Sequence, residues 1–330
     1  MRKTYKYRLL GNELSFSKAE KWLELCRELY NTALEQRIMI YRQNREQISC
    51  YSQMQQLPDL KAIFLEYREI DAQVLQNVIL RLDRAYSNFF RRLANKNDKP
   101  GFPRFKSKER YHSFTLVQNS WKLESRCLTI RNIGKFKIRL SRPIVGDIKT
   151  ITIRKETSKK WYVCFSCDNV PEKRLPKLDT MIGIDVGIKS FLVDSEGNKV
   201  ENPHYFRKSE KLLHRRQRVL SRRAKGSNRR QKARILVAKT HEQIRQQRLD
   251  FLHKIANQYV KNYGTLVFED LSIQRMAQKS HNSLAKSIND AGWGTFYGLC
   301  AYKAEEAGRS IIKINRFEPS SKTCSECGAI

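Results

Sequence analysis

Two acidic residues at the ends of apolar runs are the strongest chemical signal in this sequence. Asp185 follows Met181-Ile-Gly-Ile and Glu269 follows Thr265-Leu-Val-Phe, with glycines bounding both runs, as is typical of buried strands. A carboxylate beside an apolar strand is destabilised unless a cation or hydrogen-bond donors offset its lost hydration. Two metal ions about 4 Å apart, held by carboxylate oxygens, catalyse phosphodiester cleavage. We therefore expect Asp185 and Glu269 to meet at neighbouring strand ends, to bind Mg²⁺ and to be catalytic, although no third acid is obvious.

The cysteines include two Cys-x2-Cys pairs, and only one of them is placed to bind a metal. Cys324 and Cys327 lie among polar residues and precede Gly328, which allows a tight turn where both thiolates converge on Zn²⁺. This pair provides two of the four ligands of a tetrahedral zinc site, and the sequence ends before a second pair. Cys164 and Cys167 lie on an expected strand, which directs side chains three residues apart to opposite faces, so we do not expect them to share an ion.

The charge balance predicts a polyanionic partner. The chain has 65 Lys and Arg against 33 Asp and Glu, a net charge of +32. So large an excess favours nucleic acid, with strongly salt-dependent affinity. A membrane surface is the competing interpretation, but the sequence has no apolar run of about 18 residues and no signal-peptide core. Eight cysteines without a secretory signal predict a reducing compartment, so we expect a cytoplasmic, nucleoid-associated protein.

The elements that must position these residues follow from changes in periodicity. A strand is expected over residues 3–10, a helix from Ser17, its N-cap, to about Arg42, and a second helix over 70–94. Arg81 and Arg84 decorate this second helix and are candidates for phosphate contact, with a solvated helix face as the alternative. Residues 99–106 contain two prolines and a glycine, which exclude a helix. This loop places aromatic residues among bases, as suits stacking on nucleic acid; its candidates are Phe102, Arg104, Phe105 and Lys106.

Strand patterns dominate the middle of the chain. They cover residues 113–117, 127–130, 135–140, 148–153 and 161–167. Because one strand precedes the helices and the others follow them, we predict a β-barrel-like domain with a helical insertion. Residues 171–176 have the composition of a linker, and a new domain is expected to begin near Thr180.

Residues 208–234 form the most basic segment of the chain. They contain twelve Lys and Arg against the single acid Glu210. We predict two helices broken at residues 225–228, with an apolar seam that includes Leu213 and Leu220 and with cations facing phosphates. A disordered basic tail is the alternative, which the seam argues against. The predicted nucleic-acid contacts are Arg215, Arg216, Arg222, Arg223, Lys225, Arg229 and Arg230.

Several motifs, in their order and spacing, resemble the TnpB family of compact RNA-guided nucleases, which insertion-sequence transposons encode and which are related to type V CRISPR effectors. They are Gly101-Phe-Pro-Arg-Phe-Lys106, Gly183-Ile-Asp-Val-Gly-Ile-Lys189, Phe268-Glu-Asp-Leu271, Ser287-Ile-Asn-Asp-Ala-Gly-Trp-Gly294 and the segment Pro319 to Gly328. The resemblance implies an α+β multidomain fold. It comprises a β-barrel wedge domain (1–12 and 111–176) with an inserted helical recognition domain (13–110), a ribonuclease H-like RuvC α/β domain (177–318), and the first half of a zinc ribbon (319–330).

The resemblance also implies roles for individual residues. Asp185 and Glu269 match the first and second RuvC carboxylates, which bind Mg²⁺. The third carboxylate of the family is an aspartate beyond the zinc ribbon, and it has no counterpart in this sequence. We therefore expect weak or absent cleavage of guide-matched double-stranded DNA. The alternative is a nuclease-dead, RNA-guided DNA-binding repressor derived from the same family, and in either case guide RNA and target DNA are the expected partners.

A short DNA motif beside the target is expected to be read by the protein itself. By resemblance, the family reads this motif at positions that correspond to Tyr51, Gln76 and Thr115. A bidentate Gln76 would favour adenine in the major groove.

Two other classes of protein explain less of the sequence. An actin-like or sugar-kinase ATPase also begins with a strand that ends in Asp-x-Gly, but the later phosphate-binding glycine motifs are missing. An architectural nucleic-acid binder explains the charge and the aromatic loop. It leaves both Asp185 and Glu269 without a role.

Overall fold

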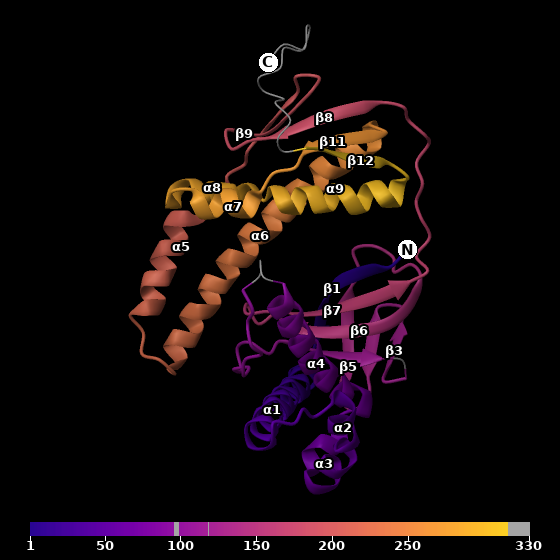
Figure 1. Cartoon of the computed structure of the whole chain (residues 1–330), viewed down its shortest axis with the longest axis vertical. Helices are drawn as coiled ribbons and strands as arrows, with labels where there is room; N and C mark the ends of the chain where they lie inside the picture. Colours follow the sequence, from indigo (N-terminus) through magenta and orange to yellow (C-terminus); the bar gives the residue numbers. More distant parts are fainter. Residues whose placement is uncertain (96–98, 118, 316–330) are drawn as a thin grey trace. The chain divides into compact units, whose positions relative to one another are not determined.

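The computed structural model describes residues 1–95, 99–117 and 119–315. The chain divides into two compact units, Met1–Pro171 and Glu172–Ile330. Each unit has its own sheet and its own hydrophobic core (Figure 1). No helix in the described part of the chain is long and apolar enough to cross a membrane. The domain boundaries expected from the sequence stay predictions.

The first unit is built on a seven-stranded sheet in which all neighbouring strands are antiparallel, in the order β2-β6-β7-β1-β5-β4-β3. The central strand, β1, comes from the start of the chain, and all the others come from beyond residue 112. The strands are β1 (Lys3–Gly11), β2 (Ser113–Val117), β3 (Trp121–Glu124), β4 (Cys127–Ile130), β5 (Gly134–Arg139), β6 (Asp147–Lys155) and β7 (Trp161–Asp168). The strand at 121–124 was not predicted from the sequence.

This sheet curls strongly. Its end strands β2 and β3 are joined by a short connection, since Val117 and Trp121 are only four positions apart. Four residues span at most about 14 Å, so the two ends of the sheet lie within that distance. Among the described residues no hydrogen-bonded pairing joins β2 to β3. The expected β-barrel is therefore an incompletely closed, barrel-like sheet.

Helices occupy the segment between β1 and β2. They are α1 (Glu13–Asn44), α2 (Cys50–Gln55), α3 (Leu57–Ile63), the 3₁₀ turn η1 (Leu65–Glu69) and α4 (Ala72–Ala94). The prediction of a start at Ser17 was wrong, because the Asn12 side chain accepts a hydrogen bond from Ser15 N at 2.8 Å and caps α1 earlier. Trp22 on α1 packs on Phe114 of β2, with ring centroids 5.6 Å apart. The helices and the sheet thus share one core.

The second unit has a five-stranded mixed sheet in the order β10-β9-β8-β11-β12. β8 pairs antiparallel with β9 and parallel with β11, and β11 pairs parallel with β12. The strands are β8 (Met181–Val186), β9 (Ser190–Asp194), β10 (Lys199–Glu201), β11 (Thr265–Glu269) and β12 (Ser310–Ile314). The parallel pairing brings together strands far apart in the chain.

The helices of this unit are α5 (Tyr205–Ser221), α6 (Asn228–Asn262), α7 (Ile273–Lys279), α8 (Asn282–Ala291) and α9 (Trp293–Ala307). The predicted break in the basic segment is confirmed, since α5 ends at Ser221 and Ser227 caps α6. Between them Gly226 adopts φ +85°, a conformation that glycine tolerates best. Phe296 of α9 packs on Phe191 of β9 in the core.

Candidate active site

Asp185 and Glu269 lie side by side at the ends of two parallel strands. The register of β8 and β11 ends with Phe268 opposite Ile184. Asp185 and Glu269 are the next residue on each strand, so both lie at the same level of strands about 5 Å apart. The structure thus brings together the two acids singled out in the sequence. Their catalytic role stays a prediction.

The alternation of side chains along each strand directs both acids outward. Ile184 of β8 and Phe268 of β11 are buried in the core of this unit, together with residues of α6 and α9. Because successive strand residues point to opposite faces, Asp185 and Glu269 lie on the other face, and both are exposed. A bound cation could therefore keep part of its water shell.

Within the part of the chain that the structure describes, neither carboxylate has a partner. No hydrogen bond or ion pair within residues 1–95, 99–117 and 119–315 reaches the side chain of Asp185 or Glu269. Two free carboxylates at one strand spacing repel each other unless a cation lies between them. Their oxygen donors fit Mg²⁺, which binds a few carboxylates and retains water. Over the same described ranges, no cluster of three or more His, Cys, Asp or Glu side chains forms a metal site.

Asp194 is also close to this pair in the sheet, because it lies beside β8 on the neighbouring strand β9. It is not available as a metal ligand. It lies opposite Ile184 on β9 and is 6 % exposed, on the core side of the sheet. Its oxygens accept hydrogen bonds from Tyr259 Oη at 2.8 Å and Asn198 Nδ2 at 3.1 Å. Burial raises its pKa, but these hydrogen bonds outweigh burial and lower the pKa overall. Asp194 fixes the turn after β9 to α6.

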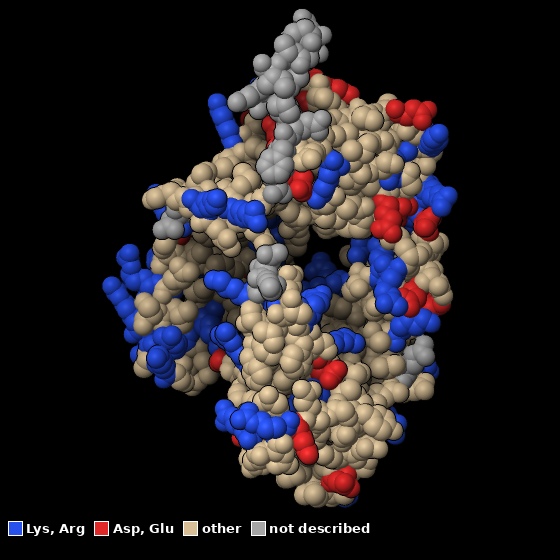
Figure 2. Space-filling view, viewed as in Figure 1, with Lys and Arg blue, Asp and Glu red and all other residues tan. Residues whose placement is uncertain are grey.

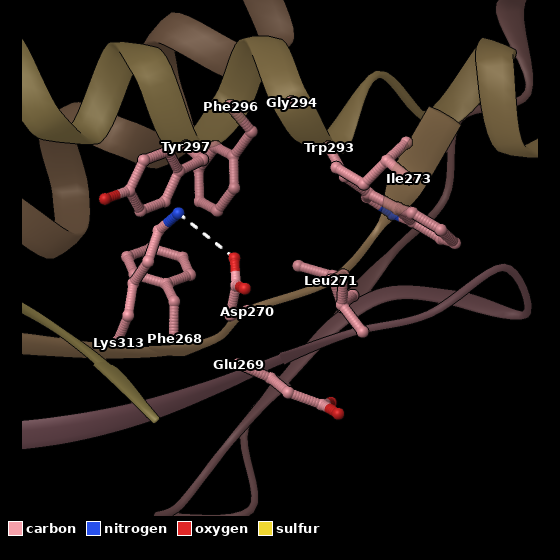
Figure 3. Close-up of a pocket in the computed structure, with 11 residues that line it drawn as sticks. Phe268, Glu269, Asp270, Leu271, Ile273, Trp293, Gly294, Phe296, Tyr297 and Lys313 are labelled. Carbon is pink, nitrogen blue, oxygen red and sulfur yellow. Dashed lines mark hydrogen bonds and ion pairs between the residues drawn. The ribbon is translucent and has the colours of Figure 1, made fainter. Parts of the chain in front are cut away.

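The residue after Glu269 points into a different environment. Asp270 accepts from Lys313 Nζ of β12 at 3.3 Å, and Lys313 lies 4.4 Å from the ring centroid of Tyr297. Figure 3 shows Asp270 directed toward Lys313 and Glu269 directed away from it. Both acids line one small pocket, together with Val186, Phe268, Leu271, Ile273, Trp293, Gly294, Phe296, Tyr297 and Lys313. Asp270 thus ties β11 to β12 and does not join Asp185.

The predicted zinc ligands Cys324 and Cys327 lie outside the described residues. The side chains of Cys164 and Cys167 point to opposite faces of β7, as the sequence predicted. Cys167 is buried in the hydrophobic core, and Cys164 lies on the other face. Burial raises the pKa of both thiols. This disfavours the thiolate form that metals bind.

Arg81 and Thr115, both proposed to contact nucleic acid, are bound to each other. Arg81 donates to Thr115 Oγ1 at 2.7 Å, to Asn77 Oδ1 at 3.0 Å and to the carbonyl of Ser113. Thr115 Oγ1 also lies 2.9 Å from Thr152 Oγ1. The structure therefore gives Arg81 an internal role that joins α4 to β2. A phosphate would have to replace these contacts.

The other candidates of the first unit are accessible. Arg84, Arg104, Tyr51 and Gln76 are exposed. The loop at 99–106 is not helical, as predicted. Phe102 packs edge-on against Phe89 at 5.3 Å and against Tyr86 at 5.5 Å, yet remains 47 % exposed, while Phe105 is 52 % exposed. Asn31 fixes the backbone of Lys106 by hydrogen bonds in both directions, at 2.7 and 3.0 Å.

The arginines of the basic hairpin formed by α5 and α6 fall into two groups, those bonded within the hairpin and those whose side chains are free within the described part of the chain. Arg216 donates to Thr240 Oγ1 at 2.6 Å, and Arg230 donates to the carbonyls of Leu220 and Arg223, both at 2.8 Å. These two close the hairpin. The side chains of the remaining candidates are exposed and have no hydrogen-bond or ion-pair partner among the described residues: Arg215, Arg222, Arg223, Lys225 and Arg229. Figure 2 shows Lys and Arg gathered over this hairpin.

A buried ion pair at the base of the hairpin was missed by the sequence analysis. Arg248 of α6 donates to Asp290 of α8 at 2.7 Å, and the Asp290 side chain is 3 % exposed. Both Asp290 oxygens also accept from Phe206 N, at 3.1 and 3.0 Å, and so cap α5. The sequence contained one indication that Asp290 is important, because this residue lies inside the motif that spans residues 287–294.

Three protein-family models match this chain. Residues 163–280 match OrfB_IS605, described as "Probable transposase", and residues 293–330 match the TNB domain of Cas12f1-like proteins. Residues 1–46 match a helix-turn-helix domain of OrfB_IS605. In the structure, this last segment forms β1 and the single long helix α1.

Individual proteins resemble the chain over most of its length. A "Putative RNA-guided DNA endonuclease" of Streptomyces pristinaespiralis is 30 % identical over 339 residues, covering all of this chain and 81 % of that protein. A relative from Escherichia coli (strain K12) with the same description is 29 % identical over 275 residues, and the chain covers 66 % of its length. Cas12f1 of Sulfoacidibacillus thermotolerans, a "CRISPR-associated endodeoxyribonuclease", is 30 % identical over 256 residues.

A solved structure described as a Cas12f1-sgRNA-target DNA complex shares the fold. Its TM-score is 0.57 at 14 % identity, covering 99 % of this chain and 92 % of that one. The mixed α+β architecture, with a barrel-like sheet and inserted helices, is thus Cas12f-like. The sequence relationships are more specific than the fold. The chain belongs to the TnpB family, also named IS605 OrfB, which includes proteins described as RNA-guided DNA endonucleases and is related to Cas12f1.

Proposed function

We propose that this protein is an RNA-guided DNA endonuclease that cleaves guide-matched double-stranded DNA at one RuvC-type site. The observation that carries the proposal is the adjacency of Asp185 and Glu269 at the ends of parallel strands β8 and β11. The strand order of this sheet, three antiparallel strands followed by two parallel ones, agrees with the ribonuclease H-like fold expected from the resemblance.

In this mechanism, Asp185 and Glu269 would hold Mg²⁺ through their outward carboxylates. The ion would supply activation of the attacking water and stabilisation of charge on the leaving oxygen. The side chains contribute negative charge in a fixed geometry, because each residue lies at the end of a hydrogen-bonded strand. Asp194 and Asp270 are engaged elsewhere, so the chemistry falls to this pair within the described chain. Base pairing with a guide RNA selects the target, while the protein holds the backbone.

The test is reconstitution from cells. The protein is purified with its co-expressed RNA, the RNA is sequenced, and plasmid DNA that matches it is incubated with Mg²⁺ or with EDTA. We expect one discrete RNA. We also expect cutting of matched DNA, weak as predicted from the sequence, with Mg²⁺ but not with EDTA. Asp185→Ala should bind the same RNA and DNA without cutting. Recovery of no discrete RNA would overturn the proposal, and binding of matched DNA by the unmodified protein without any cutting would point to the repressor alternative.

A further inference from the structure

The strand registers of the second unit place one residue from each of four strands in a single row. Asp185 pairs with Val193 of β9, and Val193 pairs on its other side with Lys199 of β10. Glu269 extends the row onto β11, one residue beyond the register pairs of β8 and β11. Residues directly opposite one another share a face of the sheet. Lys199 therefore lies on the face that carries both carboxylates, two strand spacings or about 10 Å from Asp185 between Cα atoms.

Burial agrees with this assignment of the face. Val200, the next residue of β10, packs on the hydrophobic core together with Leu192, its partner on β9. Because successive strand residues point to opposite faces, Lys199 points away from the core, and it is exposed. The same face carries Met181 of β8 and Ile312 of β12, which are 61 % and 46 % exposed. A nucleic-acid strand can thus lie along the row.

The charge of Lys199 is not used inside the unit. Among the residues that the structure describes, its side chain has no hydrogen-bond or ion-pair partner. Within the same ranges, Glu201, the acid two positions further along β10, makes no ion pair with it. Lysine carries a compact charge on a long flexible stem, which suits contact with a phosphate. Lys199 lies outside the basic helices and was not singled out from the sequence.

The position of Lys199 in the row defines a path for a strand that is cut at the carboxylate pair. Phosphates of one strand recur about every 3.4 Å of helix axis, so a cation about 10 Å away lies within about three phosphates of the scissile one. At the other end of the row, Glu269 pairs with Ile314 of β12, which carries no charge. The row therefore favours a strand that runs from Glu269 and Asp185 toward β10.

The place of β10 in the sheet offers a different explanation for an exposed lysine. β10 is an edge strand, and lysines on edge strands oppose pairing between the sheets of two molecules. This explanation predicts self-association without Lys199 and gives it no part in cutting. It does not account for the position of Lys199 at the level of the two acids.

We propose that Lys199 is a substrate-positioning residue, which binds a phosphate within about three nucleotides of the scissile bond and directs the strand across β9 and β10. This inference rests on the proposed function and adds a contact close to the site of cutting. Misplacement of a reacting group by 1 Å costs up to about 100-fold in rate. The contact therefore affects cutting more than affinity, to which many other cations contribute.

The first test compares Lys199→Ala and Lys199→Arg with the control Lys261→Ala in the whole chain. Lys261 is also exposed and has no partner among the described residues, but it lies near the start of β11, whereas Glu269 ends that strand. Each variant is purified with its RNA. Single-turnover cutting of matched DNA is measured with Mg²⁺, and the Kd for the same DNA is measured with Ca²⁺, which carboxylates also bind.

Lys199→Ala should cut roughly 10- to 100-fold more slowly than the unmodified protein. Its Kd should rise by less than about 3-fold, because one phosphate contact among many is lost. Lys199→Arg should recover most of the rate, since it retains the charge, and Lys261→Ala should change neither quantity. Equal rates for Lys199→Ala and Lys261→Ala would overturn the proposal, as would a loss of affinity as large as the loss of rate. Self-association of Lys199→Ala with normal cutting would assign the edge-strand role instead.

The second test does not depend on cutting. Lysines of the unmodified complex are acetylated with an amine-reactive ester in Ca²⁺, and modification of Lys199 and Lys261 is read by mass spectrometry. Matched DNA should slow the acetylation of Lys199 several-fold relative to the protein–RNA complex, whereas unmatched DNA should not. Lys261 should react equally in all samples. Equal reactivity of Lys199 with and without matched DNA would exclude the contact.

Failure of this inference is distinguishable from failure of the proposed function. If the unmodified protein cuts matched DNA and Lys199→Ala cuts it equally fast, only the Lys199 contact is excluded. If the unmodified protein binds matched DNA without cutting it, the acetylation result alone decides on Lys199. Recovery of no discrete RNA would overturn both proposals.

Discussion

Asp185 and Glu269 each lie one residue beyond the register pair that Ile184 and Phe268 form between β8 and β11. Two acids 84 positions apart in the chain thus lie at equivalent positions on neighbouring strands of one sheet. Because the buried neighbours fix the face on which each acid emerges, a shift of one residue on either strand would separate them.

Neutral isosteres at these positions should stop the chemistry without preventing binding. Asp185→Asn and Glu269→Gln each remove a charge that holds Mg²⁺, and the loss of metal stabilisation amounts to several kcal/mol. The expected result is a fall of cutting by at least about 100-fold, with RNA and DNA affinities unchanged or improved. Asp270→Asn is the matched control, since this neighbouring acid faces Lys313 and should leave cutting nearly intact. Similar losses in all three variants would contradict the assignment.

Removal of the buried acid at the base of the hairpin should destabilise the second unit. Asp290→Ala leaves Arg248 and the Phe206 N–H without their acceptor. Breaking a buried pair of this kind costs about 3 kcal/mol. Asp250→Ala is the control, because its pair with Lys254 is exposed on both sides and is worth less than about 1 kcal/mol. Urea unfolding of both variants measures the difference, and equal effects would show that the Asp290 cluster is not a structural anchor.

The attachment of α5 to α8 should weaken in acid. Hydrogen bonds from Lys286 and Arg207 lower the pKa of Glu210 to about 2 from its ordinary 4.5. A lowered carboxyl pKa adds stability above the ordinary value, and this stability is lost as the pH falls toward 2. The melting temperature of the unmodified protein should therefore converge on that of Glu210→Gln between about pH 4.5 and pH 2. Glu201→Gln, which alters an exposed acid without a described partner, should give a constant offset.

A single methyl group at the start of β11 should disturb the sheet that carries the acids. A Cβ on Gly264 would lie 1.8 Å from the carbonyl oxygen of Leu178, and the Gly264 N–H donates to Thr180 at 2.9 Å. Gly264→Ala must shift this backbone, at about 1 to 3 kcal/mol. Gly298→Ala on α9 has open space around it and should be neutral or stabilising. Equal unfolding midpoints for the two variants would contradict the close packing of Gly264 against the backbone of Leu178.

Local sequence patterns predicted the elements better than the contacts between them. The strand at 113–117 and the break between α5 and α6 follow from alternation and from glycine, which act within a few residues. The adjacency of Asp185 and Glu269 was also predictable, because both end buried strands. The early start of α1 was missed because two good N-cap residues, Asn12 and Ser17, lie five positions apart, and the sequence does not show which of them caps the helix.

The roles of the arginines required the structure. Arg81 lies on a helix with other arginines, and Arg216 and Arg230 lie in the same basic segment as Arg215 and Arg229. Their guanidinium groups nevertheless donate to oxygens of other elements, up to 34 residues away in the case of Arg81. The sequence does not reveal which carbonyl or hydroxyl lies within reach of a long side chain. An internal bridge and a phosphate contact therefore look alike before folding.

The central position of β1 in its sheet has a consequence for the order in which the protein assembles on the ribosome. β1 ends at Gly11, and its partners β5 and β7 begin at Gly134 and Trp161. At synthesis rates of about 5 to 20 residues per second, the first strand waits roughly 8 to 30 s for β7 to be made. Helices α1 to α4 emerge during that interval and can form local contacts first. The nascent chain therefore carries a strand, β1, with at least one unpaired edge beside the helical segment until about half of the protein has been synthesised.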